Sequence, residues 1–177
     1  MKIAIAGAAG RMGQMLIAEI ARTEGCSLAG ALEGPGSNAL GTEAAKGVKI
    51  VADPAAAIAA AETLIDFTVP AATVAHARIA ADKGVAMVIG TTGLNPEQTA
   101  TVHECARKTP IMWAANMSIG VNVLLALVER TASMLDPAYD IEVLEMHHRH
   151  KIDAPSGTAL ALGRAAAQGR GKAVRAA

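Results

Sequence analysis

A cluster of basic side chains near residue 150 has the residue types needed for proton transfer or for binding an anion. Three of the five histidines, His147, His148 and His150, stand next to Arg149 and Lys151. Histidine gains and loses a proton near neutral pH, which suits it to general acid–base chemistry. The two cations would repel a metal ion, and adjacent residues of an extended segment point to opposite sides. The cluster therefore favours an anionic substrate over a metal, with a solvated polar loop as the simpler alternative.

A helix start follows this cluster and could bind a carboxylate. Pro155 precedes Ser156, Gly157 and Thr158, and serine is a favoured residue at the N-cap of a helix. The free N–H groups of a helix N-terminus attract anions, and the hydroxyl groups nearby can add hydrogen bonds. We expect these two features together to hold an acidic substrate beside a proton donor.

Glycines near the N-terminus are spaced as in a turn that binds a dinucleotide. Gly7, Gly10 and Gly13 follow a short apolar run and open a helical pattern. Small residues let the backbone approach a pyrophosphate, although a glycine turn alone is often only a tight turn. Glu33 lies 20 residues after Gly13, at the end of the next apolar run. It is placed to accept hydrogen bonds from a ribose, or else it is an ordinary surface acid.

Two further groups of small residues stand at the ends of expected strands. They are "GTTG" at residues 90–93 and "AANM" at residues 114–117. Open α/β sheets bind ligands at the carboxyl ends of their strands, so these groups could lie against a nicotinamide ring. Without the glycine turn, both would be read as ordinary loops between a strand and a helix.

Apolar runs that alternate with helical patterns predict an α/β fold, a Rossmann-like doubly wound parallel sheet. Asp53 and Asn95 are expected N-caps, Gly84 an expected helix end, and residues 33–47 a polar, glycine-rich loop. The expected strands are residues 2–6, 27–32, 48–51, 63–69, 85–90 and 110–116. The expected helices are residues 11–22, 71–83 and two that begin at Pro54 and Pro96.

The pattern changes after residue 117, which predicts a dinucleotide-binding domain at 1–117 and a partial substrate-binding or oligomerisation domain at 118–177. The second begins with a long apolar helix at residues 118–135. Apolar and acidic residues alternate at 139–143, which predicts a strand with one face toward water. We expect the start of a smaller α+β domain.

Composition excludes several classes of function. The formal net charge is +0 and aromatic residues make up 2%, so a nucleic-acid surface with stacking platforms is not expected. Cys26 and Cys105 form no CxxC pair, and no apolar run is long enough to span a membrane. Hydrophobic residues make up 52%, which predicts a packed core. We expect a cytoplasmic protein that binds neither nucleic acid nor membrane.

With these motifs together, the sequence resembles the 4-hydroxy-tetrahydrodipicolinate reductases, the dihydrodipicolinate reductase family. The resemblance covers residues 1 to about 163 and rests on "AIAGAAGRMG", "IDFTVP", "VIGTTG", "AANMSIGVN" and "HHRHKIDAPSGTAL". The last of these motifs is the most specific to the family.

The resemblance implies an NADH- or NADPH-dependent oxidoreductase of diaminopimelate and lysine biosynthesis that reduces a cyclic imine dicarboxylate. It implies that His147 and Lys151 are catalytic. Substrate-binding residues would be His148, Ser156, Gly157 and Thr158. Cofactor-binding residues would be Gly7, Ala8, Ala9, Gly10, Arg11, Met12, Glu33, Gly90, Thr91, Thr92, Ala114, Ala115, Asn116 and Met117.

Two departures from the family pattern bear on these implications. Gly34 stands where some members carry an arginine that would bind the 2′-phosphate of NADP, so NADH is favoured. Members also continue well past this ending and form homotetramers, so we expect these residues to lack part of the assembly surface. Two alternatives stay open, namely a non-catalytic NAD(H)-binding remnant and a reductase of another small acidic imine.

Overall fold

The computed structural model describes residues 1–147, 149 and 154–172. Contacts divide the chain into two compact units, Met1–Ala114 and Ala115–Ala177. Each unit is described by itself. The predicted domain boundary after residue 117 stays a prediction.

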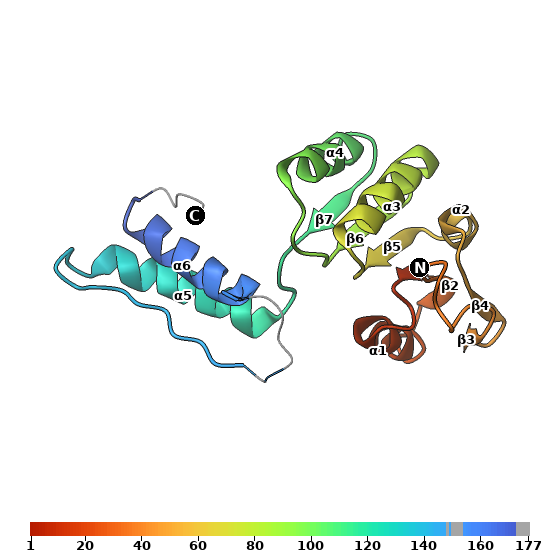
Figure 1. Cartoon of the computed structure of the whole chain (residues 1–177), viewed down its shortest axis with the longest axis horizontal. Helices are drawn as coiled ribbons and strands as arrows, with labels where there is room; N and C mark the ends of the chain where they lie inside the picture. The colour runs from red at the N-terminus through yellow and green to blue at the C-terminus, as the bar shows by residue number, and fades with distance from the viewer. Residues whose placement is uncertain (148, 150–153, 173–177) are drawn as a thin grey trace. The chain divides into compact units, whose positions relative to one another are not determined.

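The first unit is built on a seven-stranded sheet (Figure 1). Its strand order is β3-β4-β2-β1-β5-β6-β7, and every ladder is parallel except the one between β3 and β4. From β1 the chain places β2 to β4 on one side and then β5 to β7 on the other, which makes a topological switch point between β1 and β5. The predicted α/β class with a Rossmann-like sheet is confirmed. The strands are β1 (Lys2–Ala6), β2 (Ser27–Leu32), β3 (Glu43–Ala45), β4 (Val48–Val51), β5 (Thr63–Asp66), β6 (Ala86–Ile89) and β7 (Ile111–Trp113).

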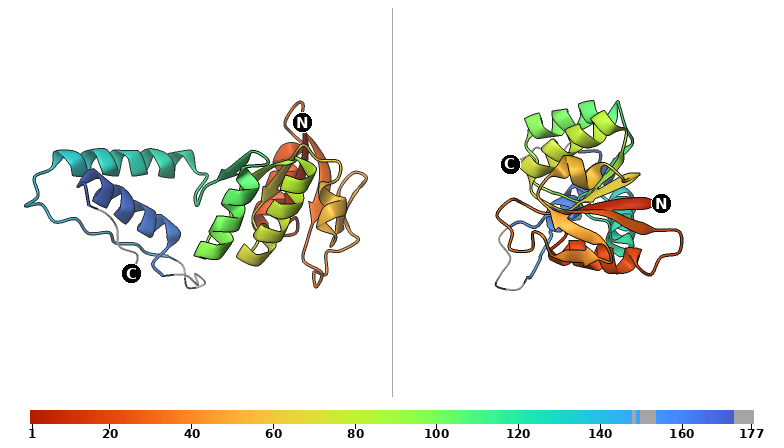
Figure 2. Two further views of the ribbon diagram at one scale, coloured as in Figure 1. Left: turned by 90° about the horizontal axis from the view of Figure 1, so that it is seen from above. Right: turned by 90° about the vertical axis from the view of Figure 1, so that its right-hand side faces the viewer.

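Helices cover both faces of this sheet. Figure 1 and the right-hand view of Figure 2 show α3 and α4 on one face and α1 on the other. Side chains of three central strands, Ile5, Leu64 and Ile89, are fully buried between these layers. The helices of this unit are α1 (Arg11–Ile20), α2 (Pro54–Ile58), α3 (Pro70–Lys83) and α4 (Pro96–Ala106).

The capping residues predicted from the sequence form the expected helix ends. Asp53 accepts a hydrogen bond from the Ala55 N–H at 2.9 Å. Asn95 and Gln98 form a reciprocal capping box, with bonds of 2.8 and 2.9 Å. Gly84 ends α3 with a φ of +68°, in the left-handed region that glycine adopts at least cost.

The segment that was predicted to be wholly loop contains a strand. Residues 43–45 form β3, which pairs antiparallel with β4 at the edge of the sheet. Gly47 makes the turn between them with a φ of +81°, and its N–H donates to the Glu43 carboxylate at 2.6 Å. The expectation of a loop was wrong there because the hairpin is short and its turn is held by the hydrogen bond between the Glu43 side chain and the Gly47 N–H.

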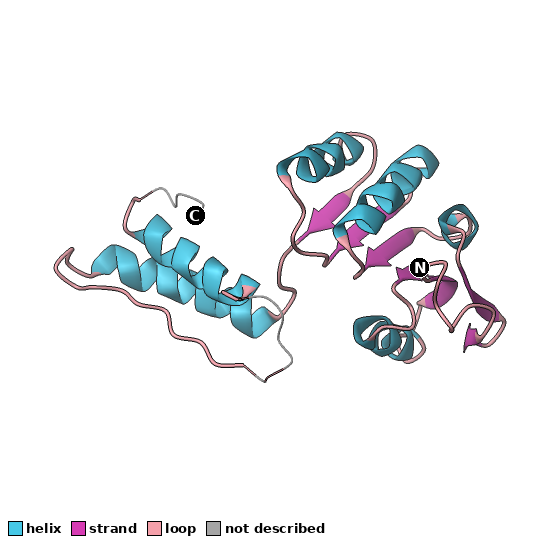
Figure 3. Ribbon diagram, in the orientation of Figure 1, coloured by secondary structure: helices cyan, strands magenta, loops and turns pink. Residues whose placement is uncertain are grey.

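The described residues of the second unit form two helices, α5 (Ile119–Met134) and α6 (Gly157–Gly169) (Figure 3). The start of α6 contacts the segment before α5, since the Asn116 side-chain amide lies 3.4 Å from the Thr158 hydroxyl. The end of α6 lies against the second half of α5, because a Cβ on Gly169 would come within 2.2 Å of the Glu129 carbonyl oxygen. The two helices therefore run in the same direction.

The strand predicted at residues 139–143 is not formed. These residues are exposed and carry no strand hydrogen bonds. A strand exists only where a neighbour completes its ladder, and none of the described residues pairs with this segment. It instead belongs to the long connection that two helices running in the same direction require.

We predict that Gly30→Ala lowers the free energy of unfolding by about 1–3 kcal/mol, a typical cost of overpacking. A Cβ at Gly30 on β2 would lie 1.9 Å from the Ala57 carbonyl oxygen on α2. Gly36→Ala is the matched control, because a Cβ there meets nothing within 4 Å. Denaturant unfolding measures both, and equal stabilities for the two variants would contradict the close packing of α2 on β2.

Candidate functional site

The turn between β1 and α1 requires its glycines. Gly7 has a φ of +79°, and a Cβ there would lie 2.9 Å from the Phe67 carbonyl oxygen. A Cβ on Gly13 would come within 2.1 Å of the Gly7 carbonyl oxygen. The first turn of α1 therefore lies directly against the chain that leaves β1.

The N-terminus of α1 has no anionic group of its own. Gly10 is its N-cap without a side-chain hydrogen bond, and the first turn contains no acid. Helices α2, α4, α5 and α6 are capped by a side chain, whereas α3, like α1, is not. The N–H groups of Arg11, Met12 and Gly13 have no partner within the helix, because the first four N–H groups of any helix lack one. This end of α1 is suited to bind a phosphate.

Glu33 contacts the glycine turn through its carboxylate. Its Oε1 accepts from the Ala9 N–H at 2.8 Å, and Oε2 accepts from the Gly34 N–H at 3.2 Å. The Gly7 and Ala8 N–H groups both donate to the Leu32 carbonyl oxygen, at 2.9 and 3.1 Å. The acid at the end of β2 is thus held at the turn, where it was expected.

A cleft of about 490 Å³ lies at the carboxyl ends of the central strands, beside the glycine turn. Gly7, Gly10 and Glu33 line it together with residues after β5, among them Thr68 and His76. A carboxylate has room for about four hydrogen bonds, so Glu33 can bind the turn and still accept from a ligand.

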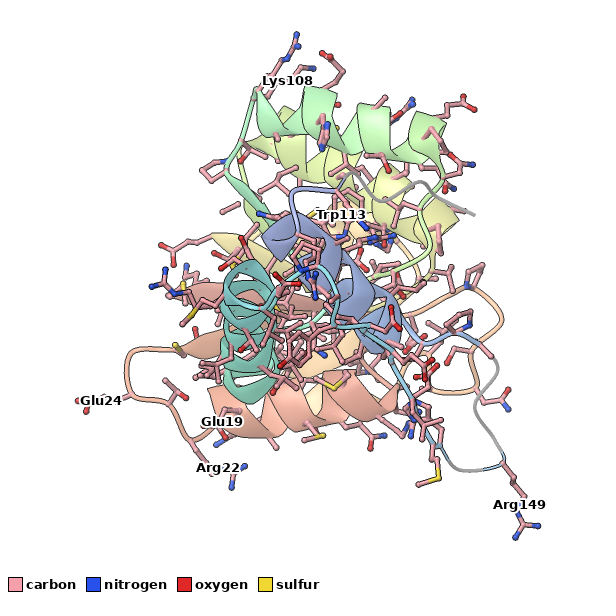
Figure 4. The ribbon with its side chains drawn as sticks, turned by 90° about the vertical axis from the view of Figure 1, so that its left-hand side faces the viewer. Glu19, Arg22, Glu24, Lys108, Trp113 and Arg149 are labelled. Atoms are coloured by element: carbon pink, nitrogen blue, oxygen red, sulfur yellow. The ribbon has the colours of Figure 1, made fainter. Side chains whose placement is uncertain are left out.

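The "GTTG" segment follows β6 and lies beside the loop after β5. The Thr68 N–H donates to the Thr91 hydroxyl at 3.0 Å. Gly90 leaves no room for a side chain, since a Cβ there would overlap the Phe67 ring at 2.0 Å. The Trp113 indole, labelled in Figure 4, donates to the Thr91 carbonyl oxygen at 3.1 Å. Thr91 is buried and Thr92 is exposed.

The "AANM" segment is divided between the two units. The Ala114 N–H donates to the Ile89 carbonyl oxygen at 3.2 Å, which extends the pairing of β6 and β7. Ala115, Asn116 and Met117 begin the second unit. There the Asn116 side chain contacts Thr158, so one predicted cofactor residue lies beside one predicted substrate residue.

In the second unit, Glu145 joins the candidate proton donor to the start of α6. Its Oε2 lies 2.8 Å from His147 Nε2, and its Oε1 accepts from the Ser156 N–H at 2.7 Å. Because an ionised carboxylate only accepts, Nε2 donates, and Nδ1 is the ring nitrogen left for a substrate. Ser156 is the N-cap of α6 and accepts from the Ala159 N–H at 3.0 Å. The predicted positions of His147 and of the helix start are thus linked.

Glu145 was missed by the sequence analysis. The signal for it was its place two residues before His147, on the same side of an extended segment. Arg149 extends into solvent from the segment that carries it (Figure 4). His148, His150 and Lys151 lie outside the described residues.

Two models of one family together match nearly the whole chain. The model described as dihydrodipicolinate reductase, N-terminus, matches residues 1–117, and the one described as dihydrodipicolinate reductase, C-terminus, matches residues 120–176. The chain belongs to the dihydrodipicolinate reductase family. The resemblance found in the sequence motifs is confirmed.

Individual proteins of this family are similar over nearly all of the chain. The 4-hydroxy-tetrahydrodipicolinate reductase of Bradyrhizobium sp. (strain ORS 278) is 50% identical over 97% of this chain and 65% of its own length. That of Rhizobium meliloti is 49% identical over 96% of this chain and 73% of its own length. The chain therefore spans about two thirds of the length of these relatives.

A solved structure has the same fold. The dipicolinate-bound dihydrodipicolinate reductase from Paenisporosarcina sp. TG-14 superposes with a TM-score of 0.79 at 27% identity. The superposition covers 100% of this chain and 69% of the other.

Among the described residues, no group of three or more His, Cys, Asp or Glu side chains is placed to hold a metal ion, and the absence of a metal stays a prediction. None of the helices in that part of the chain is long and apolar enough to cross a membrane.

We predict that the Ser156 amide senses the ionisation of Glu145. Hydrogen bonds from Ser156, and then from His147, lower the pKa of Glu145 from 4.5 to about 2. Since the folded pKa is lowered, the bond persists as pH falls below 4.5 and is lost only near pH 2. In an NMR titration the Ser156 amide proton should shift with a midpoint near 2.

Two variants make this titration specific. Glu145→Gln should abolish the shift of the Ser156 amide, whereas Glu142→Gln, on the same exposed segment, should leave it unchanged. A midpoint near 4.5 in the unsubstituted chain would show that Glu145 does not bind Ser156 in solution.

Proposed function

We propose that this protein is an NAD(P)H-dependent reductase of 4-hydroxy-tetrahydrodipicolinate in diaminopimelate and lysine biosynthesis. The observation that carries the proposal is the similarity over 97% of the chain to relatives of that name. The uncapped helix start beside Glu33 and the Glu145–His147–Ser156 cluster supply the two kinds of binding group that such a reaction needs.

The first unit fits a nicotinamide dinucleotide. The N–H groups at the start of α1 would bind its pyrophosphate, and the free lone pairs of Glu33 would accept from its adenosine ribose. Gly90 and Thr91 would lie close to the nicotinamide ring. When bound, this cofactor supplies a hydride, and the protein provides its position and surroundings.

The second unit fits an acidic substrate. The N–H group of Gly157 and the hydroxyl of Thr158 would hold a carboxylate at the start of α6, and His148 would contribute to the same site. His147, oriented by Glu145, would donate a proton from Nδ1. The 4-hydroxyl must leave as water to give a conjugated imine. Hydride addition to that imine would push negative charge onto the ring nitrogen, where the Lys151 ammonium would stabilise it, and the proton from His147 would go to the resulting enamine.

We predict that the chain oxidises NADH when the substrate is generated in situ from pyruvate and aspartate semialdehyde by the preceding synthase. His147→Gln and Lys151→Ala should each lower turnover by about 10²-fold or more, a common contribution of one acid–base group, while NADH binding is retained. NADH absorbance measures turnover, and calorimetry measures binding.

Matched variants and the alternative outcomes separate the hypotheses. His103→Gln, a histidine on α4 in the first unit, should leave turnover unchanged. NADH binding without any turnover would favour the non-catalytic remnant. Turnover that survives in both His147→Gln and Lys151→Ala would exclude the assigned roles.

We predict tighter binding of NADH than of NADPH. Glu33 lies at the expected ribose site, where its charge would repel a 2′-phosphate, and Gly34 offers no compensating cation. Gly34→Arg should lower the Kd for NADPH and leave that for NADH nearly unchanged. Equal or reversed affinities in the unsubstituted chain would contradict this preference.

The assembly and location of the protein are part of the same proposal. A homotetramer, as the resemblance implies, and a place in the cytoplasm, as the composition led us to expect, are proposed with it. A mass measurement in solution tests the former.

A further inference from the structure

A buried carboxylate stands where β5 ends. Asp66 is 0% exposed, and its Oδ1 receives four hydrogen-bond contacts. They come from the Thr68 N–H at 3.0 Å and from the hydroxyls of Thr68, Thr73 and Thr91 at 2.6, 3.1 and 3.2 Å. His76 Nδ1 lies 2.7 Å from Oδ2. Both oxygens of this acid are therefore occupied by neighbours within the first unit.

These contacts join three separate parts of the chain. Thr68 belongs to the loop after β5, Thr91 to the loop after β6, and Thr73 and His76 to α3. The Thr73 and Thr91 hydroxyls are also 2.8 Å apart. Asp66 thus holds the two loops at a fixed separation and anchors both to one helix.

The loop after β5 lines the cleft beside the glycine turn, which is the proposed nucleotide site, and the loop after β6 is bonded to that lining loop. Thr68 and His76 line the cleft with Gly7, and the Thr68 methyl would lie 3.3 Å from a Cβ on Gly7. Thr91 contacts Thr68 through the hydrogen bond to the Thr68 N–H. A change in the Asp66 network would therefore move the wall of the cleft that lies beside the glycine turn.

Packing alone gives no reason for a charge at this position. Burying a carboxylate is costly unless hydrogen bonds compensate, and a well-packed apolar group is often as stable. A fully bonded polar network does, however, fix one arrangement of the groups that it joins.

We propose that Asp66 and Thr73 are positioning residues for the cofactor, holding the Thr68 and Thr91 loops so that the nucleotide cleft is formed before binding. This inference rests on the proposed nicotinamide cofactor. Thr73 is 0% exposed, so it touches no ligand and acts only through the groups that it bonds. A preformed site saves the cost of ordering these loops when the cofactor binds.

Thr73→Val is the direct test, because it removes the hydroxyl and keeps the shape. Thr109→Val is the matched control, since Thr109 is 4% exposed and its hydroxyl donates to the Val85 carbonyl oxygen at 3.0 Å. Val85 and Thr109 precede β6 and β7, so they lie at the amino ends of these strands, whereas the cleft lies at the carboxyl ends. Both variants remove one buried hydroxyl in the same unit, although the Thr73 hydroxyl contacts Asp66, Thr68 and Thr91 whereas that of Thr109 bonds to Val85.

The readouts are NADH affinity by calorimetry and thermal unfolding of the full chain. Both variants should lower the unfolding temperature. Only Thr73→Val should raise the Kd for NADH, by roughly fivefold to tenfold, the equivalent of about one hydrogen bond. Thr73→Ser, which keeps the hydroxyl, should bind NADH within about twofold of the unsubstituted chain. If Thr73→Val does not fold, Thr73→Ala and Thr109→Ala replace the pair.

The outcomes distinguish this inference from the proposed function. No NADH binding by the unsubstituted chain would overturn both. Normal NADH binding by Thr73→Val would overturn the positioning role alone. So would an equal loss of affinity in Thr109→Val, because loss of stability would then explain the effect.

Discussion

The cleft beside the glycine turn depends on the parallel pairing of β1 with β2 on one side and β5 on the other. All three strands run in one direction, so their carboxyl ends lie together. This brings together the turn after β1, the acid after β2 and the threonine loop after β5. The next strand, β6, brings Thr91 to the same end of the sheet as well. Without this central pairing, Gly7, Glu33 and Thr68 would have no common location.

The polar groups at these strand ends fall into two kinds. Asp66 is closed off, since its oxygens are bonded within the chain and it is 0% exposed. The start of α1 is open, with neither a capping side chain nor an acid in its first turn. Glu33 is between the two, bonded to the turn and half-buried beside the cleft. The bonded carboxylate joins the loops after β5 and β6 to α3, and the start of α1 has no side-chain cap.

Much of the fold could be predicted from the sequence because its signals were local. Capping residues at Asp53 and Asn95, the glycine at 84 and the apolar runs each act within a few residues. The glycine turn is local in the same way, whereas Glu33 was singled out by its spacing of 20 residues from Gly13, and its role as a ribose ligand stays a prediction. The strand at residues 139–143 was wrong because a strand depends on a partner, which no local pattern supplies. Glu145 and Asp66 were missed because their roles come from contacts with Ser156, 11 residues away, and with Thr91, 25 residues away.

The second unit is held together differently from the first. Small residues, Ala132, Ala165 and Ala166, are buried between α5 and α6, and large apolar residues of α5 such as Ile119 and Leu127 are 82% and 58% exposed. The two helices therefore gain little from burying large side chains and rely on close backbone approach. The arrangement of the two helices then depends more on hydrogen bonds at their ends. These bonds join Asn116 to Thr158, Ser156 to Glu145 and Arg170 to the Tyr139 carbonyl oxygen. The bonds that orient the candidate proton donor are thus among those that hold the connection to α6.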